Sequence, residues 1–367
     1  MLFQHVVFPL AYVISKRKPV QKGLVVFADA HKTACPQQMK TVRAAVIEQG
    51  YVVEERYFDL RELSALQGTL AMLKFMPLYA RAEYVFLQDN FLPVAACKKR
   101  KETKVIQLWH GCGAFKKFGY DAKDDIPRYY KGNVYRNYDL VTVSGPVCRA
   151  CFAGAMRISR KRVLALGCAY TDLYYDQKEI EKTKEAFRRT FSPEKTQKVI
   201  VWAPTFRGNA GVQEEAEPVG WQAIRRLQDD KGYYVIESLH PHMQKKDTKL
   251  SMSTTQLMQC ADLLITDYSS VFFEYLLLDK PIVFYAPDLD VYRQTRGWYL
   301  DYDALPGQIV TNEQDLQRAV YAALWDEALR KQEHIKRERF REQYMAGCDG
   351  FATKRILEYM KKTEIKG

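Results

Sequence analysis

The residues that follow the apolar run Leu263–Thr266 are of types that can bind an anion. The run is short and wholly apolar, as in a parallel strand buried on both faces. Asp267, Ser269 and Ser270 come next, directly before the helical pattern Val271–Leu278. Oxygens here can cap the free amides of a helix start, and those amides together with the helix dipole can also hold a phosphate. On this stretch alone, a plain helix cap and an anion site are equally open.

Two more strand ends in the same half of the chain carry side chains that complement phosphate. Thr205 and Arg207 follow Val199–Ala203, and His240 follows Tyr233–Leu239. Ligands of open parallel sheets bind beyond the carboxyl ends of the strands, so these residue types favour a phosphate site over a chance cluster. The sequence has neither G-x-x-x-x-G-K-[ST] nor G-x-G-x-x-G, which argues against a P-loop and against a plain dinucleotide site.

His110 is the candidate general base in the first half of the chain. It follows the apolar run Val105–Leu108 and lies between Trp109 and Gly111. An imidazole titrates near neutral pH, so at a strand end it can accept a proton from an attacking hydroxyl. A lone histidine in such a place is more often structural, and both roles stay open at this point.

Alternating strands and helices must position these side chains. Apolar runs predict strands at Gly23–Ala28, Tyr51–Tyr57, Tyr84–Leu87, Val105–Leu108, Leu140–Ser144 and Arg162–Leu166, and then at Val199–Ala203, Tyr233–Leu239, Leu263–Thr266 and Ile282–Tyr285. Helical patterns include Gln37–Gln49 and Leu66–Arg81, and Asp315–Arg339 and Phe351–Lys362 near the end. This alternation predicts doubly wound parallel sheets. The length of 367 residues suits two domains, which we expect to meet near the polar segment Asp172–Thr183.

The net charge of +12 indicates a partner that is polyanionic, phosphorylated or membrane-borne. A nucleic-acid-binding protein would also be basic, but the sequence has no recognised binding module or stacking platform. The residues that we assign to acceptor binding or membrane electrostatics are Lys116, Lys117, Arg157, Arg160, Lys161 and Arg162.

The first 18 residues combine an apolar segment with a basic one. Met1–Ile14 is apolar nearly all round and precedes Lys16, Arg17 and Lys18. This order is the reverse of a signal peptide, and the segment is too short to span a membrane. An interfacial membrane segment and a first element packed on the core are both consistent with it.

The eight cysteines are scattered, which is typical of reduced thiols. Cys148 and Cys151 form a C-x-x-C pair, but no second pair lies at zinc spacing. We therefore predict no metal site.

Several motifs, in the same order along the chain, resemble those of the CDP-glycerol glycerophosphotransferases of teichoic acid synthesis. The matching segments are Trp109-His110-Gly111, Lys116–Gly119, Ala203–Arg207, His240-Pro241, Thr266–Ser270 with Phe273–Tyr275 and Lys280-Pro281, Arg296–Asp301 with Leu305–Gly307, and Asp349-Gly350. The resemblance covers roughly residues 84–356. Cys112–Phe115, which follows His110-Gly111, is similar to the priming members, which add a single unit. Glu274 stands where the family commonly has aspartate.

The resemblance implies a GT-B-like architecture of two Rossmann-like domains that face a cleft. It makes His110 the general base and His240 the residue that stabilises the transferring phosphate. It places the donor pyrophosphate on Arg207, Ser269 and Ser270, with Glu274 and Asp301 as additional donor contacts. The expected donor-binding set is Thr205, Arg207, Asp267, Ser269, Ser270, Glu274 and Asp301.

The expected function is transfer of glycerol phosphate from CDP-glycerol to a hydroxyl of an undecaprenyl-diphosphate disaccharide, with release of CMP, as a priming step. Alternatives are a ribitol-phosphate donor, a polymerase, a nucleotide-sugar glycosyltransferase and a basic nucleic-acid-binding protein. The expected domains are 1–175 for the acceptor, 176–345 for the donor, and a C-terminal helix in 346–367 that returns to the first domain. The implied location is the cytoplasmic face of the membrane, at its anionic surface. CDP-glycerol is the implied donor substrate, and the sequence identifies no cofactor and does not decide whether a divalent metal is needed.

Overall fold

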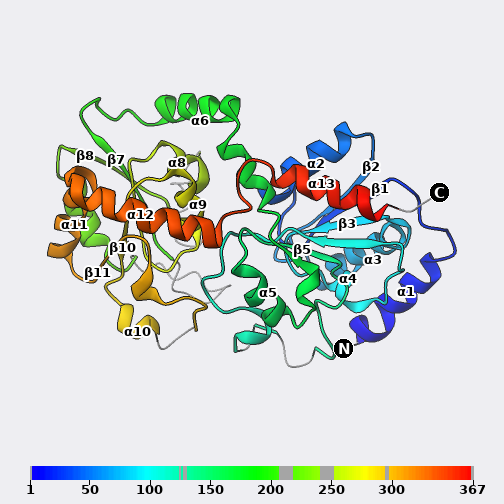
Figure 1. The fold of residues 1–367 in the computed structure, drawn as a ribbon. Coiled ribbons are helices and arrows are strands. Elements are labelled where there is room, and N and C mark those ends of the chain that lie inside the picture. Colours follow the sequence, from blue (N-terminus) through cyan, green and yellow to red (C-terminus); the bar gives the residue numbers. More distant parts are fainter. Residues whose placement is uncertain are drawn as a thin grey trace. The chain divides into compact units, whose positions relative to one another are not determined.

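The structure is a computed structural model that describes residues 2–123, 125–126, 130–205, 218–239, 252–293 and 297–364. The chain forms two compact units, each built on one parallel sheet (Figure 1). The first unit comprises Met1–Gly111, Phe118–Asp172 and Ala346–Gly367, and the second comprises Cys112–Lys117 and Leu173–Met345. The predicted fold class of two parallel-sheet α/β domains is confirmed.

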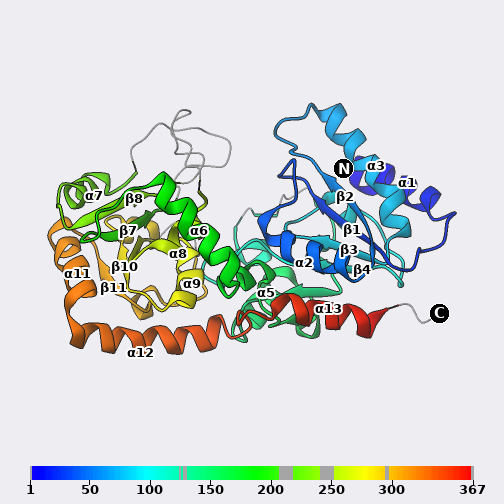
Figure 2. The ribbon, with the colours of Figure 1, turned by 90° about the horizontal axis from the view of Figure 1, so that it is seen from above.

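The first unit contains a six-stranded sheet in the order β2-β1-β3-β4-β5-β6. Its strands are β1 (Leu24–Asp29), β2 (Val52–Tyr57), β3 (Tyr84–Leu87), β4 (Lys104–Gln107), β5 (Leu140–Thr142) and β6 (Val163–Leu164). Its helical elements are η1 (Phe3–Val7), α1 (Phe8–Ser15), α2 (Gln37–Glu48), α3 (Ala65–Arg81), α4 (Leu92–Ala96), η2 (Gly119–Asp121), α5 (Cys148–Met156), η3 (Arg160–Arg162) and α13 (Ala352–Thr363), with η4 (Ala169–Tyr174) at its boundary. Helices α2 and α13 lie together on one side of the sheet, and α1 and α3 lie on the other (Figure 2).

The second unit contains a five-stranded sheet in the order β11-β10-β9-β7-β8. Its strands are β7 (Lys198–Ala203), β8 (Tyr233–Glu237), β9 (Leu263–Thr266), β10 (Ile282–Tyr285) and β11 (Gln308–Val310). Its helical elements are α6 (Gln177–Thr190), α7 (Trp221–Gln228), α8 (Thr254–Cys260), α9 (Val271–Tyr275), η5 (Leu276–Leu278), α10 (Leu289–Arg293), η6 (Tyr302–Ala304), α11 (Glu313–Trp325) and α12 (Glu327–Tyr344). Apolar residues of α7 and α11 pack with β7, β9 and β10 in one buried cluster.

Burial explains which strands the sequence predicts well. Every residue of β3, β9 and β10 is buried, and these strands have the bounds that their apolar runs predict. The edge strands are less well predicted, because only one neighbour supports them. β6 comprises Val163–Leu164 instead of Arg162–Leu166, and the half-buried β11 has no apolar run to mark it.

The segment Cys112–Lys117 belongs to the second unit, although its place in the chain predicts the N-terminal domain. Its backbone pairs with a segment almost 200 residues later: Lys117 N donates to Gly297 O at 2.8 Å, and Tyr299 N donates to Phe115 O at 2.8 Å. Gly113 has φ +71°, and a Cβ there would lie 2.2 Å from the ring of Phe273. Glycine is therefore needed at this position for both backbone conformation and space.

Helix α13 completes the first unit from the far end of the chain. Asp172 caps it, since its carboxylate accepts from Ala352 N at 3.0 Å and Thr353 N at 2.8 Å. Tyr84 Oη donates to Met360 O at 2.7 Å, which ties the helix to β3. The carboxylate at the helix start also suits the helix dipole.

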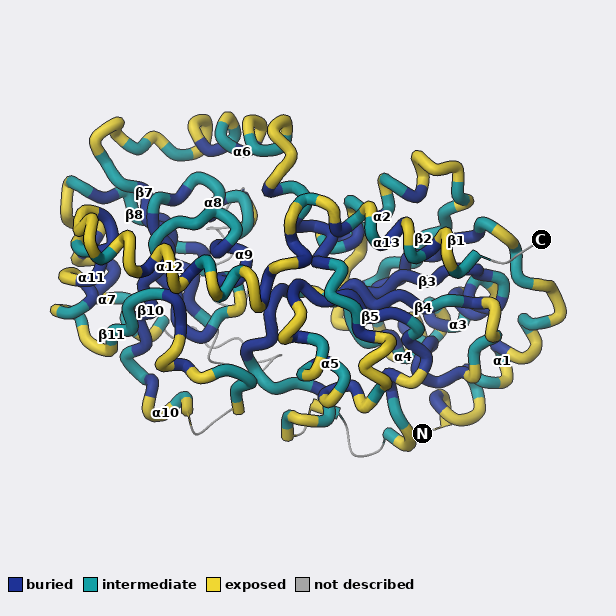
Figure 3. Tube along the Cα trace, viewed as in Figure 1, coloured by how far each residue is buried: buried dark blue, intermediate teal, exposed yellow. Residues whose placement is uncertain are grey.

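The N-terminal helix has one buried and one exposed apolar face. Phe8 and Tyr12 are each 1% exposed, and the Tyr12 ring lies 4.8 Å from that of Tyr79 in α3. Leu10 and Val13 are 57% and 60% exposed, and Figure 3 shows this alternation along α1. None of the helices in the described part of the chain has the length and hydropathy needed to cross a membrane.

Candidate active site

In each sheet the predicted residues lie at or near the place where the strand order reverses. In the first unit β1 lies between β2 and β3, and in the second β7 lies between β8 and β9. The crevice outside the carboxyl ends of the strands at such a point is where open α/β sheets bind ligands. His110 follows β4, one strand from this point in its unit, whereas Thr205 and Asp267 flank it in theirs.

His110 lies half exposed at the carboxyl edge of the first sheet. Its Nδ1 is 3.3 Å from Gln88 O, and its ring stacks on Trp109 with centroids 4.5 Å apart. When Nδ1 carries the proton and donates to that carbonyl, the lone pair is on Nε2, which can act as the base. This geometry suits proton abstraction at the strand end.

The backbone before His110 is in a strained conformation that buried groups hold. Trp109 has φ 61°, in the left-handed region that non-glycine residues seldom adopt. Its N–H donates to Gln107 Oε1 at 3.0 Å, and its ring packs 4.7 Å from that of Phe118. Gln107 is fully buried and also donates through Nε2 to Asp89 O at 3.1 Å. One buried amide therefore fixes two neighbouring strand ends.

Two residues that the sequence does not single out lie beside His110. Asp89 follows β3, and its Oδ2 is 3.8 Å from His110 Nδ1 and 3.8 Å from His31 Nε2. His31 follows β1, where its N–H donates to the buried carboxylate of Asp29 at 2.7 Å. Asp89 and His31 each lie two residues after the end of a strand, and His110 lies three residues after the end of β4. A search for polar side chains directly after strands could therefore have identified them from the sequence.

Asp267, a predicted donor contact, is 2% exposed. Its carboxylate accepts from Thr205 N at 2.8 and 3.1 Å and from Tyr268 N at 2.5 Å. It therefore joins the ends of β9 and β7. A buried carboxylate with these partners is suited to positioning the edge and would repel a phosphate.

Ser269 and Ser270 have weak local hydrogen bonds. Ser270 is the N-cap of α9, but its side chain makes no capping hydrogen bond. Ser269 Oγ accepts from Val271 N at 3.5 Å, the limit of such a bond. The structure thus shows hydroxyls at a strand end that helix capping hardly uses.

The two remaining donor candidates have local partners within the second unit. Glu274 is 8% exposed, and its Oε2 accepts from Tyr174 Oη and Thr255 Oγ1, each at 3.3 Å. Burial and the neighbouring Glu274 carboxylate raise the pKa of Tyr174 well above its usual value, so this phenol stays a donor. Asp301 is exposed and caps η6, accepting from Asp303 N at 3.1 Å.

Arg207 and His240 lie outside the described residues. The basic set predicted for acceptor or membrane contact is divided between the units: Lys116 and Lys117 belong to the second, and the four residues Arg157, Arg160, Lys161 and Arg162 belong to the first. Those four are exposed, and the Arg157 guanidinium lies 4.3 Å from the Tyr120 ring centroid. Lys116 Nζ lies 5.4 Å from the ring centroid of Tyr292.

A group in the second unit has the atom types of a metal site. Asp279, His334 and Glu338 bring their ligand atoms within 4.8 Å of one another. Asp279 already pairs with His334 Nδ1 at 2.7 Å and with the buried Arg337 Nε at 3.1 Å. A guanidinium at this distance opposes a bound cation, so the contacts indicate an ion-pair network that joins η5 to α12.

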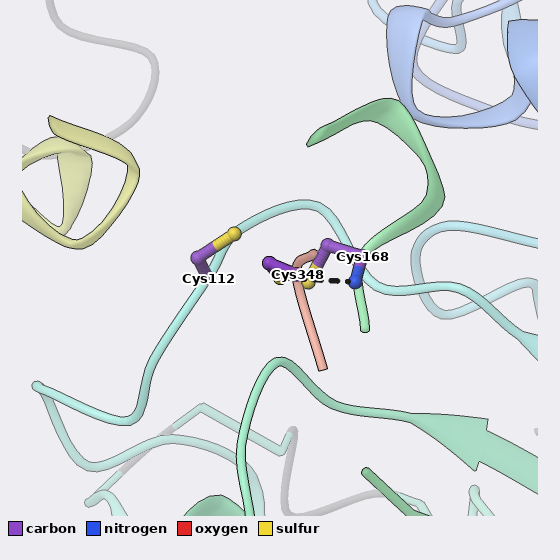
Figure 4. A group of neighbouring side chains, drawn as sticks. All are labelled: Cys112, Cys168 and Cys348. Carbon is purple, nitrogen blue, oxygen red and sulfur yellow. Dashed lines mark hydrogen bonds between the residues drawn. The ribbon is translucent and has the colours of Figure 1, made fainter. Parts of the chain in front are cut away.

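The cysteines are all free thiols. Burial raises the pKa of Cys148 to about 12, which leaves little thiolate for metal or redox chemistry at the C-x-x-C pair. In the first unit Cys168 N donates to Cys348 Sγ at 3.4 Å (Figure 4). Cys112, drawn in the same figure, begins the segment that is grouped with the second unit.

Residues 10–362 match the family of CDP-glycerol:poly(glycerophosphate) glycerophosphotransferases. The chain is 32% identical to the teichoic acid ribitol-phosphate primase of Bacillus spizizenii, over 98% of this chain and 97% of that protein. It is 29% identical to the teichoic acid glycerol-phosphate primase of Bacillus subtilis, over 88% of this chain and 83% of that protein. The solved wall teichoic acid polymerase TagF has a similar fold, with TM-score 0.74, 20% identity, and coverage of 96% of this chain and 92% of that one.

Proposed function

The chain belongs to the CDP-glycerol:poly(glycerophosphate) glycerophosphotransferase family, and from that premise we propose that it primes teichoic acid synthesis. It is a CDP-polyol phosphotransferase. In the proposed reaction, a hydroxyl oxygen of a lipid-linked acceptor attacks the phosphorus that carries the polyol. A new P–O bond forms, the bond from this phosphorus to CMP breaks, and CMP leaves with the electron pair.

The observation that carries the mechanism is the setting of His110. Its Nδ1 faces Gln88 O at 3.3 Å, so Nε2 is the atom that takes the proton of the attacking hydroxyl. At the other strand ends, Ser269, Ser270, Thr205 and Arg207 bind the donor pyrophosphate, and His240 stabilises the transferring phosphate. Such a reaction depends on in-line positioning and charge neutralisation more than on covalent chemistry.

Two donor contacts take a revised role in this proposal. Asp267 accepts from two backbone amides, and Glu274 accepts from two hydroxyls. Both therefore position the backbone and side chains near the carboxyl edge of the second sheet, where the donor is proposed to bind. Asp301 stays a candidate donor contact, since its side chain is exposed at the start of η6.

The comparisons support priming, with two candidate polyols. Both named primases align with this chain along most of their own length, 97% and 83%. Glycerol phosphate is the donor unit named by the family and by one primase, whereas ribitol phosphate is named by the primase that is 32% identical. The acceptor that we propose is an undecaprenyl-diphosphate disaccharide.

An assay that measures released CMP or UDP together with product length tests both parts of this proposal. The chain is incubated with CDP-glycerol, CDP-ribitol or a UDP-sugar, each with and without the lipid-linked disaccharide. We expect acceptor-dependent CMP release from one CDP-polyol, with one unit added per acceptor. Longer products would identify a polymerase, and turnover of the UDP-sugar alone would identify a glycosyltransferase.

We also propose that the N-terminal face docks on the anionic cytoplasmic surface of the membrane. The exposed apolar side chains Leu10 and Val13 lie on α1, which ends beside basic residues of another loop. Lys16 Nζ donates to Lys98 O at 3.2 Å, and Arg100 Nη2 donates to Lys18 O at 2.8 Å. An apolar helix face bordered by cations is the pattern of an interfacial helix.

Membrane binding is tested by cosedimentation with vesicles of phosphatidylglycerol. The double variant Leu10→Gln/Val13→Gln should reduce binding at least several-fold, since it changes only exposed side chains. Phe8 and Tyr12 stay in place, so the fold of the first unit is kept. Unchanged binding by this variant would show that α1 does not contact the membrane.

A further inference from the structure

The carboxylate of Asp89 lies between two imidazoles at the carboxyl edge of the first sheet. Its Oδ2 is 3.8 Å from His110 Nδ1 and 3.8 Å from His31 Nε2. Its Oδ1 accepts from Asn90 N at 2.7 Å, which fixes the orientation of the carboxylate. The three residues follow β4, β3 and β1, which are neighbours in the sheet.

We propose that Asp89 is a positioning residue that His110 and His31 share, and that His31 limits how strongly Asp89 supports His110 as a base. This inference rests on the proposed function, in which His110 accepts the proton of the acceptor hydroxyl. An anion near an imidazole favours its protonated form, so Asp89 strengthens the base. A protonated His31 neutralises the same oxygen and weakens that effect.

The surroundings of the three residues are consistent with one carboxylate, that of Asp89, acting on both imidazoles. Side-chain exposure is 48% for His110, 38% for Asp89 and 50% for His31, so all three can exchange protons with solvent. The backbone of His31 is held independently of its ring, by Asp29 Oδ1 at 2.7 Å and by Arg61 Nη2 at 3.4 Å. Replacing the ring therefore leaves the loop in place.

Two phenols whose electrostatic surroundings include Asp89 stay neutral. Burial raises the pKa of Tyr135 and Tyr138 well above the usual value. The buried Asp29 carboxylate accepts from Gln88 Nε2 at 2.9 Å, one residue before Asp89. Among the described residues that face Asp89, the two imidazoles are therefore the groups on which its negative charge acts.

The test is the pH profile of kcat for CMP release, whose acid limb reports the pKa of the base in the substrate complex. Asp89→Asn removes the anion, so the limb should move to lower pH by roughly half to one unit, with turnover roughly tenfold or more lower. His31→Gln removes the competing cation, so the limb should move to higher pH. His334→Gln is the matched control, since this histidine pairs with Asp279 in the second unit and should leave the profile unmoved.

A shift of the acid limb to lower pH in Asp89→Asn and to higher pH in His31→Gln supports the inference that the two histidines share this carboxylate. A lower rate with an unmoved limb in Asp89→Asn would show a structural role, and a downward or absent shift in His31→Gln would show that the histidines do not compete. Either result overturns the inference. If Asp89→Asn is too slow to profile, Asp89→Glu should recover most of the rate, and failure to recover it in a folded protein also counts against the inference.

A second measurement separates this inference from the proposed function. NMR titration of the imidazole protons reads the pKa of His110 without turnover: it should fall in Asp89→Asn and rise in His31→Gln. Absence of CMP release by the wild type from either CDP-polyol would refute the proposed function alone. Unmoved imidazole titrations would refute the inference even if the wild type is active.

Discussion

Asp89 and Asp267 occupy similar places in the two sheets and differ in what surrounds them. Each closely follows a buried strand, β3 or β9, beside the point where the strand order reverses. The Asp89 side chain is 38% exposed and faces two imidazoles, whereas Asp267 is 2% exposed and accepts from the amides of Thr205 and Tyr268. One aspartate can influence proton transfer, and the other holds two strand ends together.

The difference extends to the whole of each edge. The first edge presents half-exposed titratable side chains, with a fully buried amide, Gln107, behind them. The second edge presents hydroxyls that have little role in helix capping, supported by the buried Asp267 carboxylate. The first is suited to acid–base chemistry and the second to holding a charged group. Four predictions test this contrast.

Loss of the base should have the largest effect. His110→Ala removes the proton acceptor, so turnover should fall by about 10²–10⁴-fold, the usual range for a general base. Because the side chain is half exposed, the free energy of unfolding should hardly change. CMP release measures the first quantity, and binding of a CDP-polyol to the variant shows that the donor edge is intact. Normal turnover would exclude His110 as the base.

Replacing the two aspartates should have different effects on the free energy of unfolding. Asp267→Ala removes a buried carboxylate that accepts from the amides of Thr205 and Tyr268, which should cost about 1–3 kcal/mol in the free energy of unfolding. Asp89→Ala changes a part-exposed side chain and should cost within about 0.5 kcal/mol. Urea unfolding of both variants measures the difference. Equal losses would mean that burial does not distinguish the two positions.

The serines should affect donor affinity more than stability. The double variant Ser269→Ala/Ser270→Ala should weaken binding of the CDP-polyol roughly tenfold, because two hydroxyl contacts to a charged group are lost. Ser253→Ala is the matched control, since Ser253 caps α8 in a capping box with Gln256. That control should lose about 1 kcal/mol of stability and keep its donor affinity. Calorimetric binding with both proteins decides between a cap and an anion site.

The smallest expected effect is a loss of stability in acid from the loop after β2, where Arg61 also donates to His31 O. Hydrogen bonding to Arg61 lowers the pKa of Asp59 to about 2. Because the folded pKa lies below the unfolded value of about 4, this stabilisation is complete above about pH 4 and is lost as the pH falls towards 2. The Arg61 side chain is 61% exposed, so water screens the pair and the loss should be about 1 kcal/mol or less. Urea unfolding of the wild type and Asp59→Asn should converge below pH 2.

The sequence predicted most of the fold because its local patterns are strong. Apolar runs such as Tyr84–Leu87 and Leu263–Thr266 are buried central strands, and burial on both faces permits few polar residues. The candidate site was only partly predictable. His110 was predicted from its place after a strand, whereas Asp89 and His31, which lie in equivalent places, were not predicted. Asp267 was assigned to the donor, because exposure cannot be read from residue type.

The sequence by itself therefore determined the order of strands and helices, the two-domain α/β class and which polar side chains follow the strands, since all three follow from local patterns. Only the tertiary structure decided which aspartate is buried and which of them faces imidazoles. It also decided that Cys112–Lys117 joins the second unit. That outcome depends on hydrogen bonds between residues almost 200 positions apart, such as Tyr299 N to Phe115 O, which no local pattern encodes.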